Sequence, residues 1–108
     1  MGYIDKKIAM QYLANSEKLF NSLKNNFISN YKEYKDSLSL YLNDKNYEGI
    51  YNIIHQIKGF SLNIGSEVLY NDSIHILEEI QKKGETSPFL VECYIESLEM
   101  CYLELSRM

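Results

Sequence analysis

Apolar residues recur along this chain at helical spacing, and no segment alternates between apolar and polar residues for long enough to indicate a strand. Steps of three, four and seven residues place one side of each predicted helix against a core. The pattern predicts a short helix over residues 5–13 and four longer helices over residues 16–42, 47–63, 66–83 and 88–106. Because the loops between the longer helices are short, sequential helices should pack as antiparallel neighbours. The predicted fold class is all-α: an antiparallel up-down-up-down four-helix bundle with a short N-terminal helix across one end.

Residues typical of helix ends stand at several of these boundaries. Asn15 or Ser16 should cap the second helix, and Gly65 should close the third. Ser87 followed by Pro88 should start the last helix, with a capping hydroxyl and a proline in the first turn. The positions predicted to face the core are Ile4, Ile8, Leu13, Phe20, Leu23, Phe27, Tyr34, Leu38, Tyr41, Ile50, Ile53, Ile54, Ile57, Phe60, Ser61, Ile64, Leu69, Ile76, Ile80, Leu90, Tyr94, Leu98, Cys101 and Leu105.

Length and charge narrow the class of protein. A chain of 108 residues has room for one core, so residues 1–108 are predicted to form a single domain. The net charge of −4 and the scattered lysines argue against a nucleic-acid partner, which would require a clustered basic face. No apolar run approaches the ~20 residues that span a bilayer, and the N-terminus lacks the apolar centre of a signal peptide. We expect a cytoplasmic protein with no membrane contact.

The two cysteines, Cys93 and Cys101, lie eight residues apart in the last predicted helix. That spacing separates them by roughly 12 Å along the helix axis, which is too far for a disulfide bond. We expect both to be reduced core residues without a redox or metal-binding role.

His55 raises the functional question, because it stands inside the isoleucine-rich third helix. On a helical wheel at ~100° per residue, the core face of this helix spans roughly 120°, and His55 lies roughly 160° from its centre. The imidazole should therefore point into solvent. Its neighbours on the same face are Tyr51, Lys58, Gly59 and Leu62.

These neighbours have properties that an ordinary helix surface does not require. Gly59 costs the helix ~1 kcal/mol relative to alanine, and the missing Cβ would let another surface approach the imidazole. Lys58 would supply a counter-charge for a phosphoryl group on His55. Tyr51 and Leu62 place apolar groups on a face that should be polar, and they are candidate docking contacts.

The segment "HQIKG" followed by "NIG" resembles the signature of histidine phosphotransfer (HPt) domains: a histidine, two residues, Lys-Gly, and a second glycine ten residues after the histidine. His55, Lys58, Gly59 and Gly65 match all four positions. The segment "IDKKIAMQYLANSEKLFNSLKNNF" is similar to the family's first helix, its turn and the start of its second helix. The resemblance therefore covers nearly the whole chain.

The resemblance implies a histidine-containing phosphocarrier of a two-component phosphorelay. His55 would accept a phosphoryl group from an aspartyl phosphate on a receiver domain and pass it to another receiver, with Lys58 as the phosphate partner and Gly59 as the clearance residue. Tyr51 and Leu62 would then contact the receiver. The partners would be receiver domains of response regulators or hybrid histidine kinases. The receiver would supply Mg²⁺, so this chain would need no cofactor of its own, and a monomer is the simplest expectation.

The sequence departs from the family at one position. Family members often carry a Glu or Gln 22 residues after the histidine, which accepts a hydrogen bond from Nδ1 of the imidazole. Leu77 stands at that position here. Glu78, the next residue, is the candidate for this orienting contact.

Other chemistry finds no support in the sequence. There is no P-loop, no glycine-rich nucleotide loop and no acidic cluster with metal-ligand spacing, so we expect no ATP binding, no hydrolysis and no metal site. The chain would be a carrier and not an enzyme. His75 has no Lys-Gly partner and should be a surface or boundary residue.

Two alternatives to a free-standing carrier remain open. One is the phosphoacceptor domain of a larger histidine kinase. The other is an interaction module that binds a receiver without carrying phosphate, and the missing Glu at position 77 slightly favours it.

Overall fold

A computed structural model describes residues 2–108 of the chain. This range contains five α-helices, one 3-10 turn and no strand, which confirms the all-α prediction. The elements are α1 (Lys6–Tyr12), α2 (Glu17–Asn43), α3 (Tyr47–Ser61), the 3-10 turn η1 (Leu62–Ile64), α4 (Glu67–Lys83) and α5 (Pro88–Ser106).

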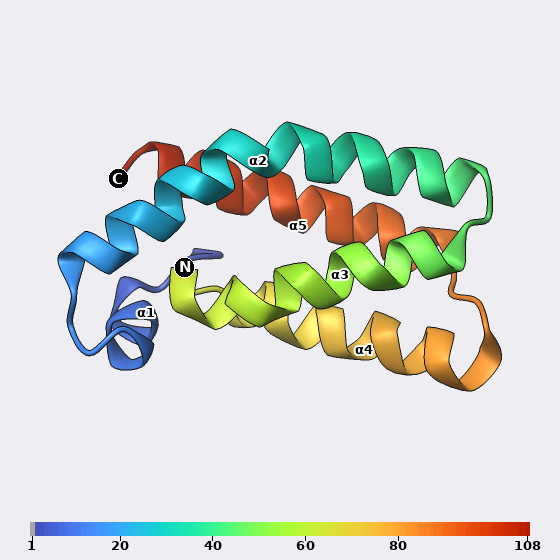
Figure 1. The fold of residues 1–108 in the computed structure, drawn as a ribbon, viewed down its shortest axis with the longest axis horizontal. Helices are drawn as coiled ribbons and strands as arrows, with labels where there is room; N and C mark the ends of the chain where they lie inside the picture. The colour runs from blue at the N-terminus through green and yellow to red at the C-terminus, as the bar shows by residue number, and fades with distance from the viewer. Residues whose placement is uncertain (1) are drawn as a thin grey trace.

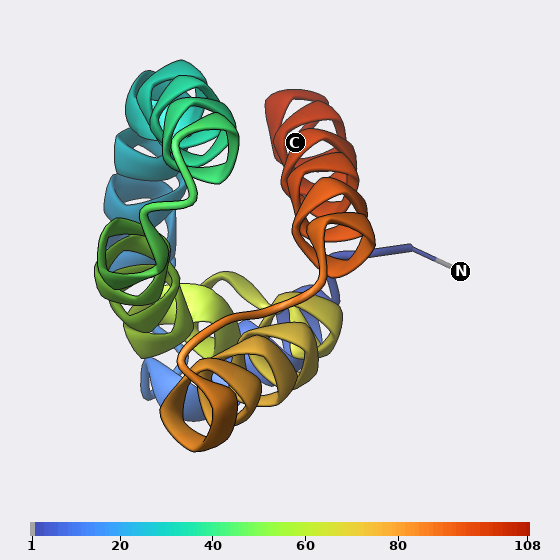
Figure 2. The same ribbon diagram turned by 90° about the vertical axis from the view of Figure 1, so that its right-hand side faces the viewer.

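The four long helices run alternately up and down around a shared core (Figures 1 and 2). α3 packs against α4 and α2 against α5, while contacts between α2 and α3 and between α4 and α5 close the ring. α1 lies across one end of the bundle, against η1 and the start of α2 (Figure 1). Within residues 2–108, no helix combines the length and the apolar character needed to cross a bilayer.

The helix-end residues mostly act as predicted. Ser16 caps α2, its Oγ accepting a hydrogen bond from the backbone N–H of Leu19 at 3.1 Å. Ser66 caps α4 in the same way. α3 is two residues shorter than predicted, because residues 62–64 tighten into η1 before Gly65 reverses the chain in the left-handed conformation, with φ of 88°.

The capping role predicted for the Ser87 hydroxyl is wrong. Ser87 is the residue before α5, but its side chain makes no capping hydrogen bond. Its backbone N–H instead donates to Oε1 of Glu79 at 3.1 Å, and the hydroxyl of Thr86 donates to the same oxygen at 2.6 Å. A carboxylate from the neighbouring helix therefore organises this loop.

Most positions predicted to face the core are buried, and the exceptions lie at the borders of each helix face. Ile8, Leu23, Tyr41, Ile53, Phe60, Ile80 and Leu90 are half-buried. Ala9, Leu77 and Val91 are buried although the apolar stripes did not include them. Each helix of the ring packs against two others, so its buried face is wider than one stripe.

The two cysteines differ in environment, so the prediction that both belong to the core is wrong for one of them. Both thiols are free; Cys101 is buried, with Sγ 3.4 Å from Oγ of Ser66, whereas Cys93 is exposed. Eight residues along a helix correspond to a rotation of about 80° from one stripe position to the other. That rotation carries Cys93 out of the core.

Candidate functional site

His55 is exposed on α3, as predicted. Ile50, Ile54 and Ile57 are fully buried on the opposite side of the same helix. The amphipathic pattern of α3 therefore determines where the imidazole points: isoleucine burial fixes the rotation of the helix, and His55 follows from it.

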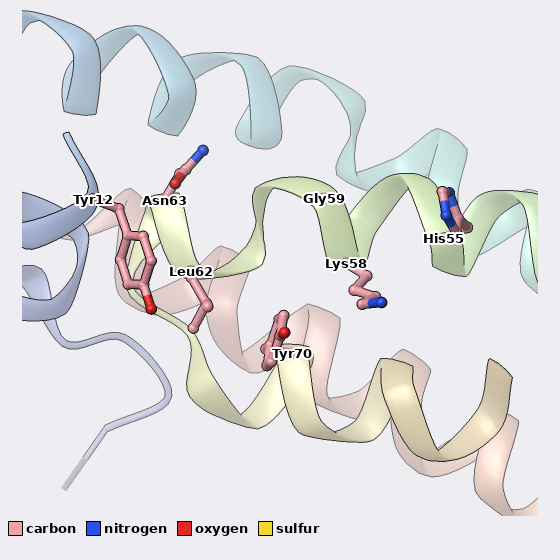
Figure 3. A pocket seen from close by; sticks show the side chains of 7 residues that line it. All are labelled: Tyr12, His55, Lys58, Gly59, Leu62, Asn63 and Tyr70. Atoms are coloured by element: carbon pink, nitrogen blue, oxygen red, sulfur yellow. The ribbon is translucent and has the colours of Figure 1, made fainter. Parts of the chain in front are cut away.

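A groove with a volume of about 290 Å³ lies beside His55 (Figure 3). It is shared by α1, α3, η1 and α4. Its lining residues are Tyr12, His55, Lys58, Gly59, Leu62, Asn63 and Tyr70. This lining contains one lysine and no carboxylate, although the chain as a whole carries a net charge of −4.

Lys58 follows His55 by one turn of α3. The Lys58 side chain projects from α3 toward α4, and its ammonium is displaced slightly toward the His55 end of the helix (Figure 3), as helical side chains lean toward the N-terminus. Neither of the ion pairs found within residues 2–108 involves Lys58. The ammonium is therefore available to an anion that arrives at the groove.

Gly59 occupies an open position. A Cβ built on this residue would meet no other atom of the chain within 4 Å. A glycine inside an α-helix costs ~1 kcal/mol relative to alanine, and the internal packing of this protein does not require one here. A partner that approaches from outside would meet no side chain at this position.

Gly65, the second glycine of the motif, is required by the fold. Its φ of 88° is unfavourable for other residues, and a Cβ would overlap the backbone carbonyl of Asp5. The backbone N–H of Asp5 also donates to the Gly65 carbonyl at 2.8 Å. This close approach ties the segment before α1 to the turn after α3.

Two aromatic residues of the groove, Tyr12 and Tyr70, were not among the predicted site residues. Figure 3 shows them on either side of Leu62, so the end of the groove away from His55 is largely apolar. Tyr12 is 58% exposed and reaches the groove only because α1 is anchored beside η1. Tyr70 lies on α4 and reaches the groove because α4 packs against α3.

The two predicted docking residues occupy different places. Leu62 lines the groove, whereas Tyr51 does not. Tyr51 is half-buried against the core on the other side of His55, and its ring lies nearly parallel to the imidazole.

Leu77, at the position where the HPt pattern often has Glu or Gln, is buried and 5% exposed. Glu78 is exposed and lines a second groove together with His75, Glu79, Lys82 and Lys83. In residues 2–108 no hydrogen bond links Glu78 to His55. The orienting role of Glu78 remains a prediction that no contact here supports.

His75 is exposed, as expected for a surface residue. Among the residues that the structure describes, no three His, Cys, Asp or Glu side chains are grouped so that they could hold a metal ion. The site centred on His55 is thus built from an imidazole, an ammonium group, a bare stretch of helix and an apolar patch.

Comparison of the chain with protein-family models, with curated proteins and with solved structures gives no match.

Proposed function

We propose that this chain is a histidine phosphotransfer carrier in which His55 holds the phosphoryl group between two receiver domains. One observation carries the proposal: the imidazole of His55 is exposed on the polar face of α3. Lys58 follows it by one helical turn, and the position of Gly59 is open. These features lie on the same groove.

The reaction needs little from this chain beyond a positioned nucleophile. An unprotonated nitrogen of His55 attacks the phosphorus of an aspartyl phosphate on the receiver. The N–P bond forms as the acyl P–O bond breaks, and the aspartate leaves as a carboxylate. Return transfer to a second receiver reverses these bond changes. A neutral imidazole is a competent nucleophile near neutral pH.

Lys58 supports the phosphorylated form by charge. An ammonium about 4 Å from a phosphoryl oxygen contributes about 1 kcal/mol per unit charge in water, and about 4 kcal/mol where a docked partner excludes solvent. The lack of carboxylates in the groove lining removes the nearest source of repulsion. Lys58 would therefore act mainly within the transfer complex.

The apolar end of the groove supports docking of a receiver domain. Tyr12, Leu62 and Tyr70 form a patch at the end of the groove away from His55, and Gly59, between the patch and His55, lets a partner backbone come close. The receiver would bring the aspartate and the Mg²⁺ ion that neutralises the moving phosphoryl group.

Incubation with a phosphorylated receiver domain tests the proposal. We expect label on the wild-type chain that is labile in acid and stable in alkali, as expected of a phosphohistidine, and no such label on His55→Gln. A wild-type chain that binds the receiver but takes no label would overturn the carrier proposal.

Receiver binding without label would indicate that the chain is an interaction module. The buried Leu77, at the position of the orienting Glu or Gln, favours this alternative. A module that only binds needs no group to orient the imidazole. Whether the domain works alone or within a larger histidine kinase does not change the transfer chemistry at His55.

A further inference from the structure

The imidazole of His55 has one aromatic neighbour, Tyr51. The two ring centroids are 6.1 Å apart and the ring planes differ by 16°. Aromatic pairs interact favourably in offset-stacked arrangements with centroids about 4.5–7 Å apart. The residues are four apart on α3, so their side chains share one surface of the helix. His55 also leans toward Tyr51, because helical side chains incline toward the N-terminus.

The side chains of Tyr51 and His55 differ in how firmly the surrounding residues hold them. Tyr51 is half-buried and packs against the hydrophobic core, while His55 is exposed. Neither imidazole nitrogen forms a hydrogen bond with any residue from 2 to 108, and the hydroxyl of Tyr51 forms none either. Leu77, which packs into the core from α4, offers no polar group. Tyr51 is thus the more firmly held ring of the pair.

We propose that Tyr51 is the positioning residue for His55 and that it acts by stacking. The inference rests on the proposed transfer function, which it deepens. At a centroid separation of 6.1 Å the rings lie side by side in an offset arrangement that leaves both imidazole nitrogens open. This arrangement limits the rotamers of His55 without occupying the atom that accepts phosphate. The aromatic ring is what matters, so phenylalanine should replace tyrosine.

NMR of the unphosphorylated protein tests the orientation directly. Three-bond couplings should show one dominant χ1 rotamer for His55 in the wild type and in Tyr51→Phe, with its ring protons shifted upfield by the neighbouring ring. In Tyr51→Leu, which keeps an apolar side chain against the core, the couplings should average and the upfield shift should disappear. Unchanged couplings in Tyr51→Leu would overturn the proposal.

Transfer kinetics supply the second readout. Tyr51→Leu should lower the maximal transfer rate about 2- to 10-fold, the range expected for losing an aromatic pair, while the dissociation constant for the receiver stays within about twofold. Tyr51→Phe should match the wild type. Tyr102→Leu is the control, because Tyr102 also stacks on an aromatic ring, that of Tyr31, but does not line the His55 groove; it should leave the maximal rate and the dissociation constant within about twofold of the wild type.

The two measurements separate failure of this inference from failure of the proposed function. If no receiver phosphorylates the wild type, the carrier function fails, and the couplings still decide whether Tyr51 orients the imidazole. If the wild type transfers phosphate and Tyr51→Leu raises only the dissociation constant, Tyr51 is a docking residue and the positioning proposal is wrong.

Discussion

His55 and His75 are both exposed, lie on adjacent antiparallel helices, and line grooves of about 290 and 220 Å³. Their surroundings differ in charge. The His55 groove contains Lys58 and no carboxylate, whereas the groove of His75 is lined by two carboxylates and two lysines, Glu78, Glu79, Lys82 and Lys83. Both histidines are exposed, so exposure of an imidazole does not by itself indicate a phosphate-accepting site.

The surroundings of His75 offer a phosphoryl dianion less net positive charge than those of His55, because its carboxylates offset its lysines. A hydrogen bond from Thr86 lowers the pKa of Glu79, so this carboxylate is charged near neutral pH. Asp72 is a third acidic group near His75: burial raises the pKa of its carboxyl, and the nearby His75 partly offsets that rise. Phosphate on His75 would meet carboxylates as well as ammonium groups, whereas phosphate on His55 would meet an ammonium and no carboxylate.

Exchange of each histidine for glutamine should give the largest contrast. His55→Gln should reduce acid-labile label to background, because the nucleophile is gone, while His75→Gln should label like the wild type. Autoradiography after incubation with a phosphorylated receiver measures both. A loss of label in His75→Gln with His55 intact would contradict the distinction between the two grooves.

Filling the open position beside His55 should have the next largest effect. Gly59→Gln should slow transfer by more than about tenfold because a side chain would separate the receiver from the imidazole. Rapid-quench transfer assays would measure the rate. Because a Cβ meets nothing here, Gly59→Ala should raise the free energy of unfolding by up to ~1 kcal/mol in urea denaturation.

Gln56 provides the matched control for Gly59, since it is adjacent to His55 in sequence but lines a groove on another side of the molecule. Gln56→Leu should leave transfer within about twofold of the wild type. If Gly59→Gln transfers as fast as the wild type, the clearance argument is wrong.

Removing the Lys58 ammonium should lower the transfer rate less than filling the position of Gly59. Lys58→Gln should lower the transfer rate about fivefold or more, which corresponds to about 1 kcal/mol of lost charge stabilisation. Lys82→Gln, in the groove of His75, should have no effect. Stopped-flow measurement of receiver dephosphorylation would compare the two, and equal rates for both variants would mean that Lys58 is only a solvated side chain.

The smallest effect is expected for Glu78→Gln. Because no hydrogen bond joins Glu78 to His55 in the described part of the chain, transfer should change by less than about twofold. A tenfold decrease in the transfer rate would show that Glu78 orients the imidazole in the transfer complex. Glu78 would then have the role that a Glu or Gln at position 77 often has in HPt domains.

Residue spacing within single helices was enough to predict much of the fold and about half of the site. Isoleucine spacing in α3 predicted both the core face and the exposure of His55, and Ser16, Gly65 and Gly84 stand where helices begin or end. These features depend on interactions within a few residues, which sequence spacing reports directly.

The features that sequence reasoning missed arise between distant segments. Tyr12 joins the groove because Asp5 and Gly65 hold α1 beside η1, a contact across about 60 residues. Glu79 displaces Ser87 as the organiser of the α4–α5 loop for a similar reason. The parallel packing of Tyr51 and His55 depends on side-chain rotamers, which spacing alone does not give.

Mapping the phosphorylated residue by mass spectrometry, under alkaline conditions that preserve phosphohistidine, tests the central claim most directly. After incubation of the wild-type chain with a phosphorylated receiver domain, fragment spectra should place the phosphoryl group on His55 and leave His75 unmodified. Phosphate on His75, or an unmodified His55 under conditions in which the receiver binds and is fully phosphorylated, would contradict the account.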